Sequence, residues 1–245
     1  TFQYAGIIEL FAPNLKEFLQ PNTHNKCFSN SKLKHIRCLG NISFIPEGNT
    51  NFGCFNNSPL ETVILPETLA EIRSFAFRNV TSVVSMNLPK SLERIASLPY
   101  GSLADGIDIS LPNLMVIDSF AGRGIKRVSN LGSVTSLGVT SGNVEVRGCS
   151  NLEFVRLPST VTSIGVSTFY RCTALQAVII EAVTPPALCY YAFNLSNNTP
   201  IYVPNESVSA YQSASGWSAY ASRIMGLDSL PSNNPDLYEE IKDYL

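Results

Sequence analysis

The sequence is poor in charged residues, which make up 15 % of its 245 positions, against about 25 % in ordinary soluble domains. Its 17 Lys and Arg nearly balance its 19 Asp and Glu, giving a net charge of −2. It therefore lacks the basic excess that nucleic acids or anionic membrane surfaces attract. No apolar run approaches the roughly 20 residues that cross a bilayer. We expect neither a nucleic-acid partner nor a transmembrane segment.

Cysteine is also scarce, because six Cys in a chain of this length are far fewer than a disulfide scaffold carries. The chain starts at Thr1 without an initiator Met, and no charged segment leads into an apolar one as in a signal peptide. We therefore expect a processed or truncated product. The low Lys content and the many Asn, Ser and Thr residues suit an extracellular surface.

What the sequence does contain is a repeat of 23 residues. Five prolines that follow an apolar residue lie 23 residues or a multiple of 23 apart, at Pro66, Pro89, Pro112, Pro158 and Pro204. Two of them close a segment of the form Leu-x-x-Val-x-Leu, in residues 60–66 and 152–158, and the segment at residues 83–89 is similar. Apolar residues recur three and six positions after the proline, and a Phe follows five positions later. This spacing indicates an internal repeat.

Some copies are out of phase with this spacing. The copy at residues 125–131 comes four residues early, and the copy at 33–39 lies 27 residues before the one at 60–66. A degenerate copy occupies residues 10–13. We count about nine repeats between residues 7 and 203.

Each repeat predicts one short strand, because Val63 and Leu65 alternate with Thr62 and Ile64 at the period of two typical of strands. The apolar side chains of one repeat cannot offset the entropy of ordering its backbone. Stacking on neighbouring repeats must supply the missing core and ladder hydrogen bonds. The spacing also falls within the range of leucine-rich repeats. The predicted fold is therefore a right-handed leucine-rich-repeat solenoid, of α/β type or mostly β.

The repeats resemble one family in particular. Cys149 to Phe169 has the form Cys-x-x-Leu-x-x-Val-x-Leu-Pro-x-x-Val-x-x-Ile-Gly-x-x-x-Phe, which is similar to the BspA-like leucine-rich repeats of bacterial surface proteins. Residues 184–220 resemble the last repeat and the C-terminal cap of that family. The resemblance covers about residues 33–227.

The resemblance implies a non-enzymatic protein, displayed on the cell surface or secreted. It would act in adhesion by binding a host or bacterial surface protein or a glycan. The family shares no catalytic residues, and no cofactor is implied. A lipid anchor, if there is one, would lie in a segment outside this chain. The sequence is compatible with a monomer.

Three regions are predicted. Residues 1–203 form the solenoid, degenerate at 1–32; residues 204–230 form its C-terminal cap; residues 231–245 form an acidic helical tail. In the cap, Asn205 or Ser207 should cap a helix that runs through Tyr211. Trp217 should cover the apolar edge of the last repeat, and a ligand-binding role for it is the less favoured alternative. The tail should be a short acidic helix with a solvated face or a frayed end.

Two His-x-x-Cys pairs, His24 with Cys27 and His35 with Cys38, have a spacing like that of zinc ligands. Residues three apart in a strand point to opposite faces, and the repeat places Cys38 inward and His35 outward. We therefore expect no metal site.

The remaining thiols and carboxylates give no catalytic prediction. Cys27-Phe28 aligns with Cys54-Phe55, which indicates a structural position. Cys149 and Cys172 are one repeat apart; a disulfide is geometrically allowed, but parallel stacking favours two buried free thiols. Glu61 and Glu153 lie four repeats apart, too far to act on one bond. We therefore predict that the protein is not an enzyme.

Outward strand positions form the surface that a solenoid offers to partners. The candidate contact residues are Arg37, Thr62, Ile64, Asn87, Asp108, Arg127, Phe154, Arg156 and Ile179. We place Phe154 and Arg156 at the centre, because aromatic and Arg side chains are frequent interface anchors. Exposed apolar residues such as Phe154 and Ile179 suggest either a partner or a covering segment. The alternative is a structural spacer or assembly segment of a longer repeat array, with no dedicated ligand.

Overall fold

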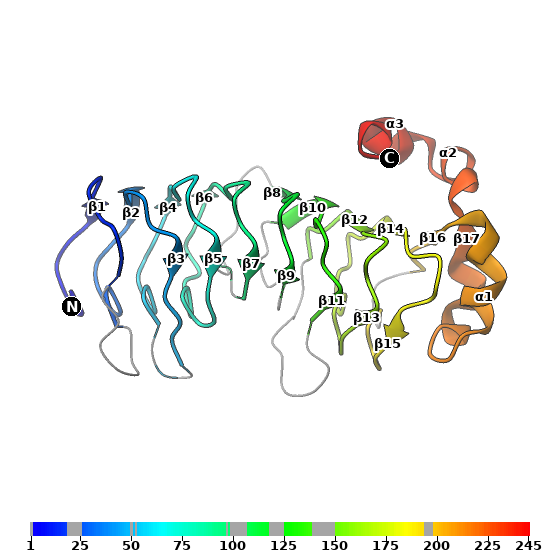
Figure 1. The fold of residues 1–245 in the computed structure, drawn as a ribbon, viewed down its shortest axis with the longest axis horizontal. Coiled ribbons are helices and arrows are strands. Elements are labelled where there is room, and N and C mark those ends of the chain that lie inside the picture. Colours follow the sequence, from blue (N-terminus) through cyan, green and yellow to red (C-terminus); the bar gives the residue numbers. More distant parts are fainter. Residues whose placement is uncertain are drawn as a thin grey trace.

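The chain winds into a solenoid of about eight turns, in which parallel strands stack along two sides (Figure 1). This computed structural model describes residues 2–18, 26–49, 51, 53–96, 98, 107–117, 125–138, 150–193 and 198–245. The predicted leucine-rich-repeat solenoid is confirmed. The count of nine repeats included terminal copies, those of β1 and β16, for which the described residues show a strand on one side of the solenoid only.

The predicted repeat strands form two parallel ladders along one side, whose outer surface we call the strand face. The first ladder contains β1 (Glu9–Phe11), β2 (His35–Cys38), β4 (Thr62–Val63) and β6 (Ser85–Met86). The second contains β8 (Ile107–Ser110), β10 (Ile125–Asn130), β12 (Phe154–Leu157), β14 (Ala177–Ile180), β16 (Ile201–Val203) and β17 (Ile224–Gly226). The predicted register is confirmed, because Val63 pairs with Met86 and Val155 pairs with Val178.

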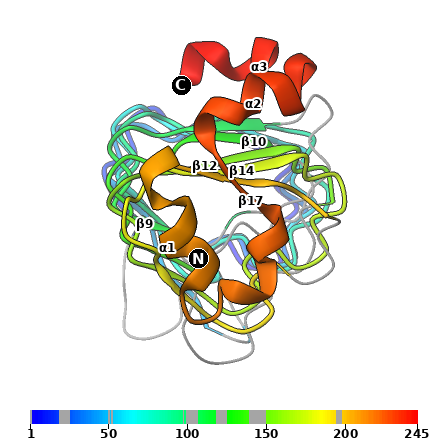
Figure 2. The same cartoon turned by 90° about the vertical axis from the view of Figure 1, so that its right-hand side faces the viewer.

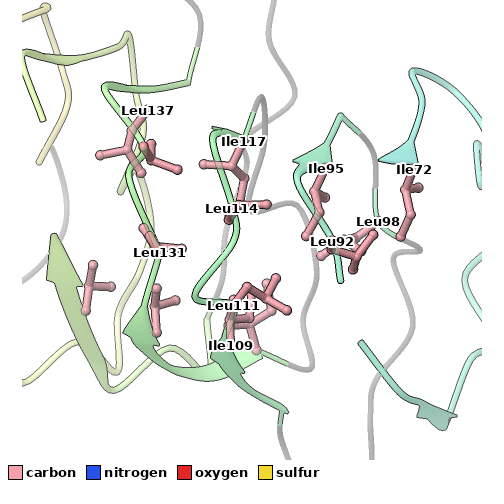
Figure 3. Packing of buried hydrophobic residues seen from close by; sticks show 14 of the residues in the cluster. Ile72, Leu92, Ile95, Leu98, Ile109, Leu111, Leu114, Ile117, Leu131 and Leu137 are labelled. Carbon is pink, nitrogen blue, oxygen red and sulfur yellow. The ribbon is translucent and has the colours of Figure 1, made fainter. Parts of the chain in front are cut away.

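The opposite side of the solenoid is one continuous sheet of seven very short strands. They are β3 (Phe44–Ile45), β5 (Glu71–Ile72), β7 (Arg94–Ile95), β9 (Val116–Ile117), β11 (Ser136–Leu137), β13 (Ser163–Ile164) and β15 (Ala187–Leu188). In each of the strands β5 to β13 the second residue is fully buried. Figure 3 shows Ile72, Ile95, Ile117 and Leu137 projecting into the interior beside the leucines of the turns. The core is therefore continuous from coil to coil.

The recurring proline begins a tight turn that leads from the first strand of a coil to the second. The amide of Leu69 donates to the carbonyl of Pro66 at 3.0 Å, and the same bond recurs after Pro89 and Pro158 at 3.1 Å. Proline fits there because its fixed φ suits a turn and its missing N–H is not needed.

Hydroxyl groups link successive coils and account for part of the Ser- and Thr-rich composition. Thr68, Ser91 and Thr160 each lie two residues after a repeat proline. Their hydroxyls donate to a backbone carbonyl of the preceding coil at 3.0, 2.7 and 2.9 Å. These bonds satisfy carbonyls that the short strands leave unpaired.

Glycine replaces proline in the copies that are out of phase. Gly132 has a φ of +56°, and a Cβ there would lie 2.6 Å from the Leu114 carbonyl oxygen of the preceding coil. Gly40 is equivalent, with a φ of +61° and 2.4 Å to the Leu15 oxygen. Only glycine meets both requirements, so the shifted turn keeps the strands in step.

Stacked aromatic rings run through the interior at both ends of the solenoid. At the N-terminal end Phe2, Phe28, Phe55 and Phe77 form successive stacked pairs with centroids 5.2, 5.7 and 5.3 Å apart. The structural role predicted for Phe28 and Phe55 is thus confirmed. Near the C-terminal end Phe169 and Phe193 stack at 5.2 Å.

The cap closes the C-terminal end. It consists of η1 (Asn205–Ser207), α1 (Val208–Ser213) and η2 (Ser218–Arg223), followed by β17. Trp217 is fully buried 6.0 Å from Phe193, and its Nε1 donates to the Pro186 carbonyl at 2.7 Å. Its role as a plug is confirmed, and the alternative of a ligand platform is wrong because no solvent reaches the ring.

The predicted helix through Tyr211 is present as α1, and Ser207 occupies its N-cap position, but the expected side-chain capping bond is absent. Neither Asn205 nor Ser207 accepts a capping hydrogen bond with its side chain, because the chain enters α1 directly from the 3₁₀ turn η1. Asn205 Oδ1 instead accepts from the amide of Asp228 at 3.2 Å.

After β17 the chain folds back over the strand face. This tail comprises η3 (Leu227–Ser229), α2 (Leu230–Asn233), α3 (Pro235–Ile241) and η4 (Lys242–Tyr244). Figure 2 shows α2 and α3 on the outer side of β10, β12 and β14. Asn234 caps α3, accepting from the Leu237 amide at 3.3 Å. The predicted acidic helix with a solvated face is present as α3, whose acidic side faces solvent. Its other side, which the prediction did not describe, is buried at Leu237 and Ile241.

Candidate functional site

The strand face is divided into an open and a covered section. The open section is made of the outward residues of β1, β2, β4 and β6 together with those next to them: Glu9, Phe11, His35, Arg37, Thr62, Ile64, Ser85 and Asn87. The covered section is the apolar group Phe154, Ala177, Ile179 and Tyr202, which lies beneath α2 and α3. Four of the predicted contact residues lie in the open section: Arg37, Thr62, Ile64 and Asn87. Two lie in the covered section, Phe154 and Ile179. The remaining three lie beside or between the two sections: Asp108, Arg127 and Arg156.

Ile64 is the apolar residue in the middle of the open section, and Phe11 of β1, which is 69 % exposed, lies at its edge. The Ile64 side chain is 48 % exposed, although it follows directly on buried Val63. Its amide donates to the Ile36 carbonyl at 2.9 Å, and the Asn87 amide donates to the Val63 carbonyl at 3.4 Å. These bonds place Arg37, Ile64 and Asn87 in one row across three strands.

The polar neighbours of Ile64 are held in different ways. Arg37 Nε lies 3.6 Å from Glu9 Oε1, and both side chains are about half exposed. Asn87 is fixed more firmly, because its Nδ2 donates to the Leu65 carbonyl at 2.9 Å and its Oδ1 accepts from the Leu65 amide at 2.6 Å. The Asn87 amide thus pairs with the neighbouring strand as a backbone would, whereas Arg37 can be recruited by a partner.

Charges at the margin of the open section are compensated. Lys34 Nζ donates to Glu61 Oε1 at 2.7 Å. This hydrogen bond lowers the pKa of the Glu61 carboxyl below its usual value. The open section therefore offers two exposed apolar side chains, Phe11 and Ile64, among paired charges, and no strong field of either sign.

The structure brings His35, Thr62 and Glu61 together, a grouping that sequence reasoning did not single out. His35 Nδ1 and Thr62 Oγ1 are hydrogen-bonded at 2.6 Å, and Nε2 lies 4.0 Å from Glu61 Oε2. A nucleophile–base pair of this kind needs a third group hydrogen-bonded to the base. Glu61 is too distant for that and is held by Lys34, so the arrangement is a cross-strand polar contact. The sequence did contain a signal for this contact, because the repeat places His35 and Thr62 at equivalent outward positions of neighbouring strands.

The predicted exposure of Phe154 and Ile179 is wrong. Their exposed fractions are 0 % and 1 %, because Leu230, Leu237 and Ile241 of the tail pack on them. The covering segment, one of the two explanations considered for these residues, is thus the correct one. The signal was present in the tail, since Leu237 and Ile241 are four residues apart and share one helix face.

Arg127 and Arg156, in the middle of the strand face, form ion pairs with different parts of the chain. The Arg127 guanidinium forms an ion pair with Glu240 of α3, through Nη2 and Oε2. Arg156 Nε donates to Glu181 Oε1 at 2.9 Å, on the coil that follows it. Asp108, which is exposed, accepts from Ser129 Oγ at 2.8 Å. Phe154 and Arg156 therefore do not form a free central anchor.

The described cysteines are free thiols in different surroundings. Cys54 is fully buried, which raises its pKa well above the usual value, and its hydrogen bond to Cys27 lowers the pKa of Cys27. No three metal-ligating side chains converge among the residues described. Cys172 is buried, but Cys149 and His24 lie outside the described residues, so the predictions made for them stay predictions.

Comparison with known proteins agrees with this architecture. A family model described as the BspA type leucine-rich repeat region matches residues 48–138 and 142–217, in six copies. No curated protein gives a significant match. Within the described ranges, no helix is both long and apolar enough to cross a membrane.

Proposed function

Because the chain belongs to the family of BspA-type leucine-rich repeat proteins, we propose that it is a non-catalytic module of a cell-surface or secreted protein. It binds a host or bacterial surface protein, or a glycan, through the open section of its strand face. The observation that carries the proposal is Ile64, a large apolar side chain exposed in the middle of this section. Arg37 and Asn87 flank it in the same row.

The composition of the open section supports a contact role. An interface needs an apolar anchor surrounded by polar groups that exclude water. Ile64 supplies the anchor, and the half-exposed Arg37–Glu9 pair supplies a charge that a partner can engage. The hydrogen bonds of Asn87 and of His35 with Thr62 hold the surrounding sheet rigid, which lowers the entropy lost on binding.

An adhesion assay tests the proposal. Beads coated with the chain are counted on host epithelial and bacterial cells, with and without protease or periodate treatment of the cells to separate protein from glycan ligands. Ile64→Asp should reduce bead binding about tenfold, as expected for a central interface residue, and Arg37→Glu should reduce it less. Met115→Asp is the matched control, because Met115 is similarly exposed but lies beside the opposite sheet. Equal binding by the Ile64 and Met115 variants would reject the open section.

One observation favours the second candidate, an assembly segment of a longer array. β1 ends its ladder, and Phe2, Ile8 and Phe11 around it are each more than half exposed. An edge strand of this kind can pair with a further coil. Sedimentation measurements over a range of concentrations should then show self-association that Phe11→Asp abolishes, whereas a monodisperse wild type would count against assembly through this edge.

A further inference from the structure

The covered section forms an apolar contact separate from the solenoid core. One cluster joins the buried residues of the coils and the cap. A second cluster contains only outward residues of β12, β14 and β16 and the tail residues Leu230, Leu237 and Ile241. The solenoid core is therefore complete without the tail, and the tail is held by three large apolar side chains and the ion pair of Arg127 with Glu240.

The tail fits the apolar part of this surface better than its polar part. Arg127 Nε and Tyr202 Oη are buried and have no hydrogen-bond partner among the described residues. Burial raises the pKa of Tyr202, and the nearby Asn233 side chain offsets only part of this rise. Buried donors without acceptors weaken a contact, so a ligand that supplied both acceptors would bind this surface more tightly than the tail does.

We propose that the covered section is a docking site for an acidic amphipathic helix of a partner protein. Residues 227–245 occupy it as an exchangeable internal ligand. The tail itself shows the chemistry of the partner: two branched apolar side chains four residues apart, with a carboxylate just before the second, as in Leu237, Glu240 and Ile241. The proposal rests on the proposed function in taking the strand face as the binding surface, but it concerns a different section.

The site can be tested with the full chain and the tail as a free peptide. In the full-length double variant Leu237→Asp/Ile241→Asp the tail should dissociate from the covered section, because two carboxylates cannot be buried against Phe154 and Ile179. A fluorescein-labelled peptide of residues 227–245 should then bind the variant saturably in an anisotropy titration. Binding to the wild type should be at least about a hundredfold weaker, because the attached tail competes at a high effective concentration.

Two changes test the polar part of the site. The peptide with Asn233→Asp, which places a carboxylate near Tyr202, should bind about tenfold more tightly through one charge-assisted hydrogen bond. Adding Arg127→Gln to the double variant should weaken peptide binding severalfold and reduce its salt dependence. Lys126→Gln is the control, because the neighbouring Lys126 forms its ion pair with Glu153 of the solenoid, at 3.5 Å.

Folding of the variants is monitored through Trp217, the single Trp of the chain, whose emission should stay that of a buried ring. A chain ending at Gly226 provides a second acceptor that retains every residue of the solenoid core. Failure of the peptide to bind either folded acceptor, or equal binding to the wild type, would overturn the proposal. So would a wild-type dimer that exchanges tails, since a second copy would then be the occupant. None of these outcomes depends on the adhesion assay with Ile64→Asp.

Discussion

The N-terminal and C-terminal parts of the solenoid use the same repeat but finish its surfaces differently. Around β1 to β6 the strand face is open and polar apart from Phe11 and Ile64, and the stacked phenylalanines end in Phe2, which is 53 % exposed. Around β12 to β17 the strand face is apolar and covered, and the aromatic stack ends in buried Trp217. The repeat thus fixes the interior of each coil, whereas outward and terminal positions are free to differ and can carry function.

The largest expected difference concerns the two ends of the aromatic stacks. Trp217→Ala should lower the free energy of unfolding by about 3–5 kcal/mol, the usual cost of deleting a large buried aromatic side chain. Phe2→Ala should cost less than about 1 kcal/mol, because one face of its ring is already in water. Urea unfolding followed by far-ultraviolet circular dichroism measures both changes in the free energy of unfolding. Similar changes would mean that Phe2 is packed as tightly at the N-terminal end as Trp217 is in the cap.

The next comparison is between the two sections of the strand face. Phe154→Ala should lower stability by about 2–3 kcal/mol, less than in a solenoid core because the tail can detach. Ile64→Ala should stay within about 0.5 kcal/mol, as is typical of surface positions. Amide hydrogen exchange of residues 230–241 should accelerate in the Phe154 variant alone. Unchanged exchange there would show that the tail is held by other contacts.

A smaller effect separates the ion pairs of the two sections. A double-mutant cycle with Arg127→Gln and Glu240→Gln should give a coupling of about 0.5–1 kcal/mol, because the Arg127 side chain is largely shielded by the tail. The same cycle on Lys34 and Glu61, where the basic side chain is about twice as exposed as that of Arg127, should give a weaker coupling that 1 M salt removes. Equal couplings with equal salt dependence would contradict the shielding of Arg127.

The smallest effect is the titration of Glu61. Lys34 holds the pKa of this carboxyl below its usual value. A carboxyl with a lowered folded-state pKa adds stability above its unfolded pKa and loses it as the pH falls through the folded pKa. Lys34→Gln should raise the pKa of Glu61 toward its usual value. The stability that the wild type loses at acidic pH through this carboxyl should then disappear. Carbon-detected NMR titration of the Glu61 side chain measures it, and an unmoved pKa would exclude Lys34 as the cause.

The periodic part of the fold could be predicted because each coil repeats the same physical constraints. The alternation of residues around Val63 predicted the strand and which of its sides faces inward, and Pro66 predicted the turn that follows the strand. The early copy at residues 125–131 kept its register, with Arg127 beside Phe154, through the left-handed turn at Gly132. Stacking forces equivalent residues to lie next to one another, so sequence spacing translates directly into position.

The candidate site could be predicted only in part. Which residues point outward followed from the period of two, and Arg37, Thr62 and Ile64 do lie on the strand face. Which of them meet solvent did not follow, because the segment that buries Phe154 and Ile179 comes from more than fifty residues further along the chain. The pairing of His35 with Thr62 was implied by the register, but the hydrogen bond required the actual side-chain orientations.

The sequence by itself determined the solenoid, its coil length, its register and the buried identity of the repeat positions, because these follow from periodicities that every neighbouring coil reinforces. Only the tertiary structure decided which part of the strand face is open, because the tail has no repeat to fix its place. The pattern of a short amphipathic helix predicts that one of its faces will be buried. The surface on which it packs depends on shape and charge across the whole molecule.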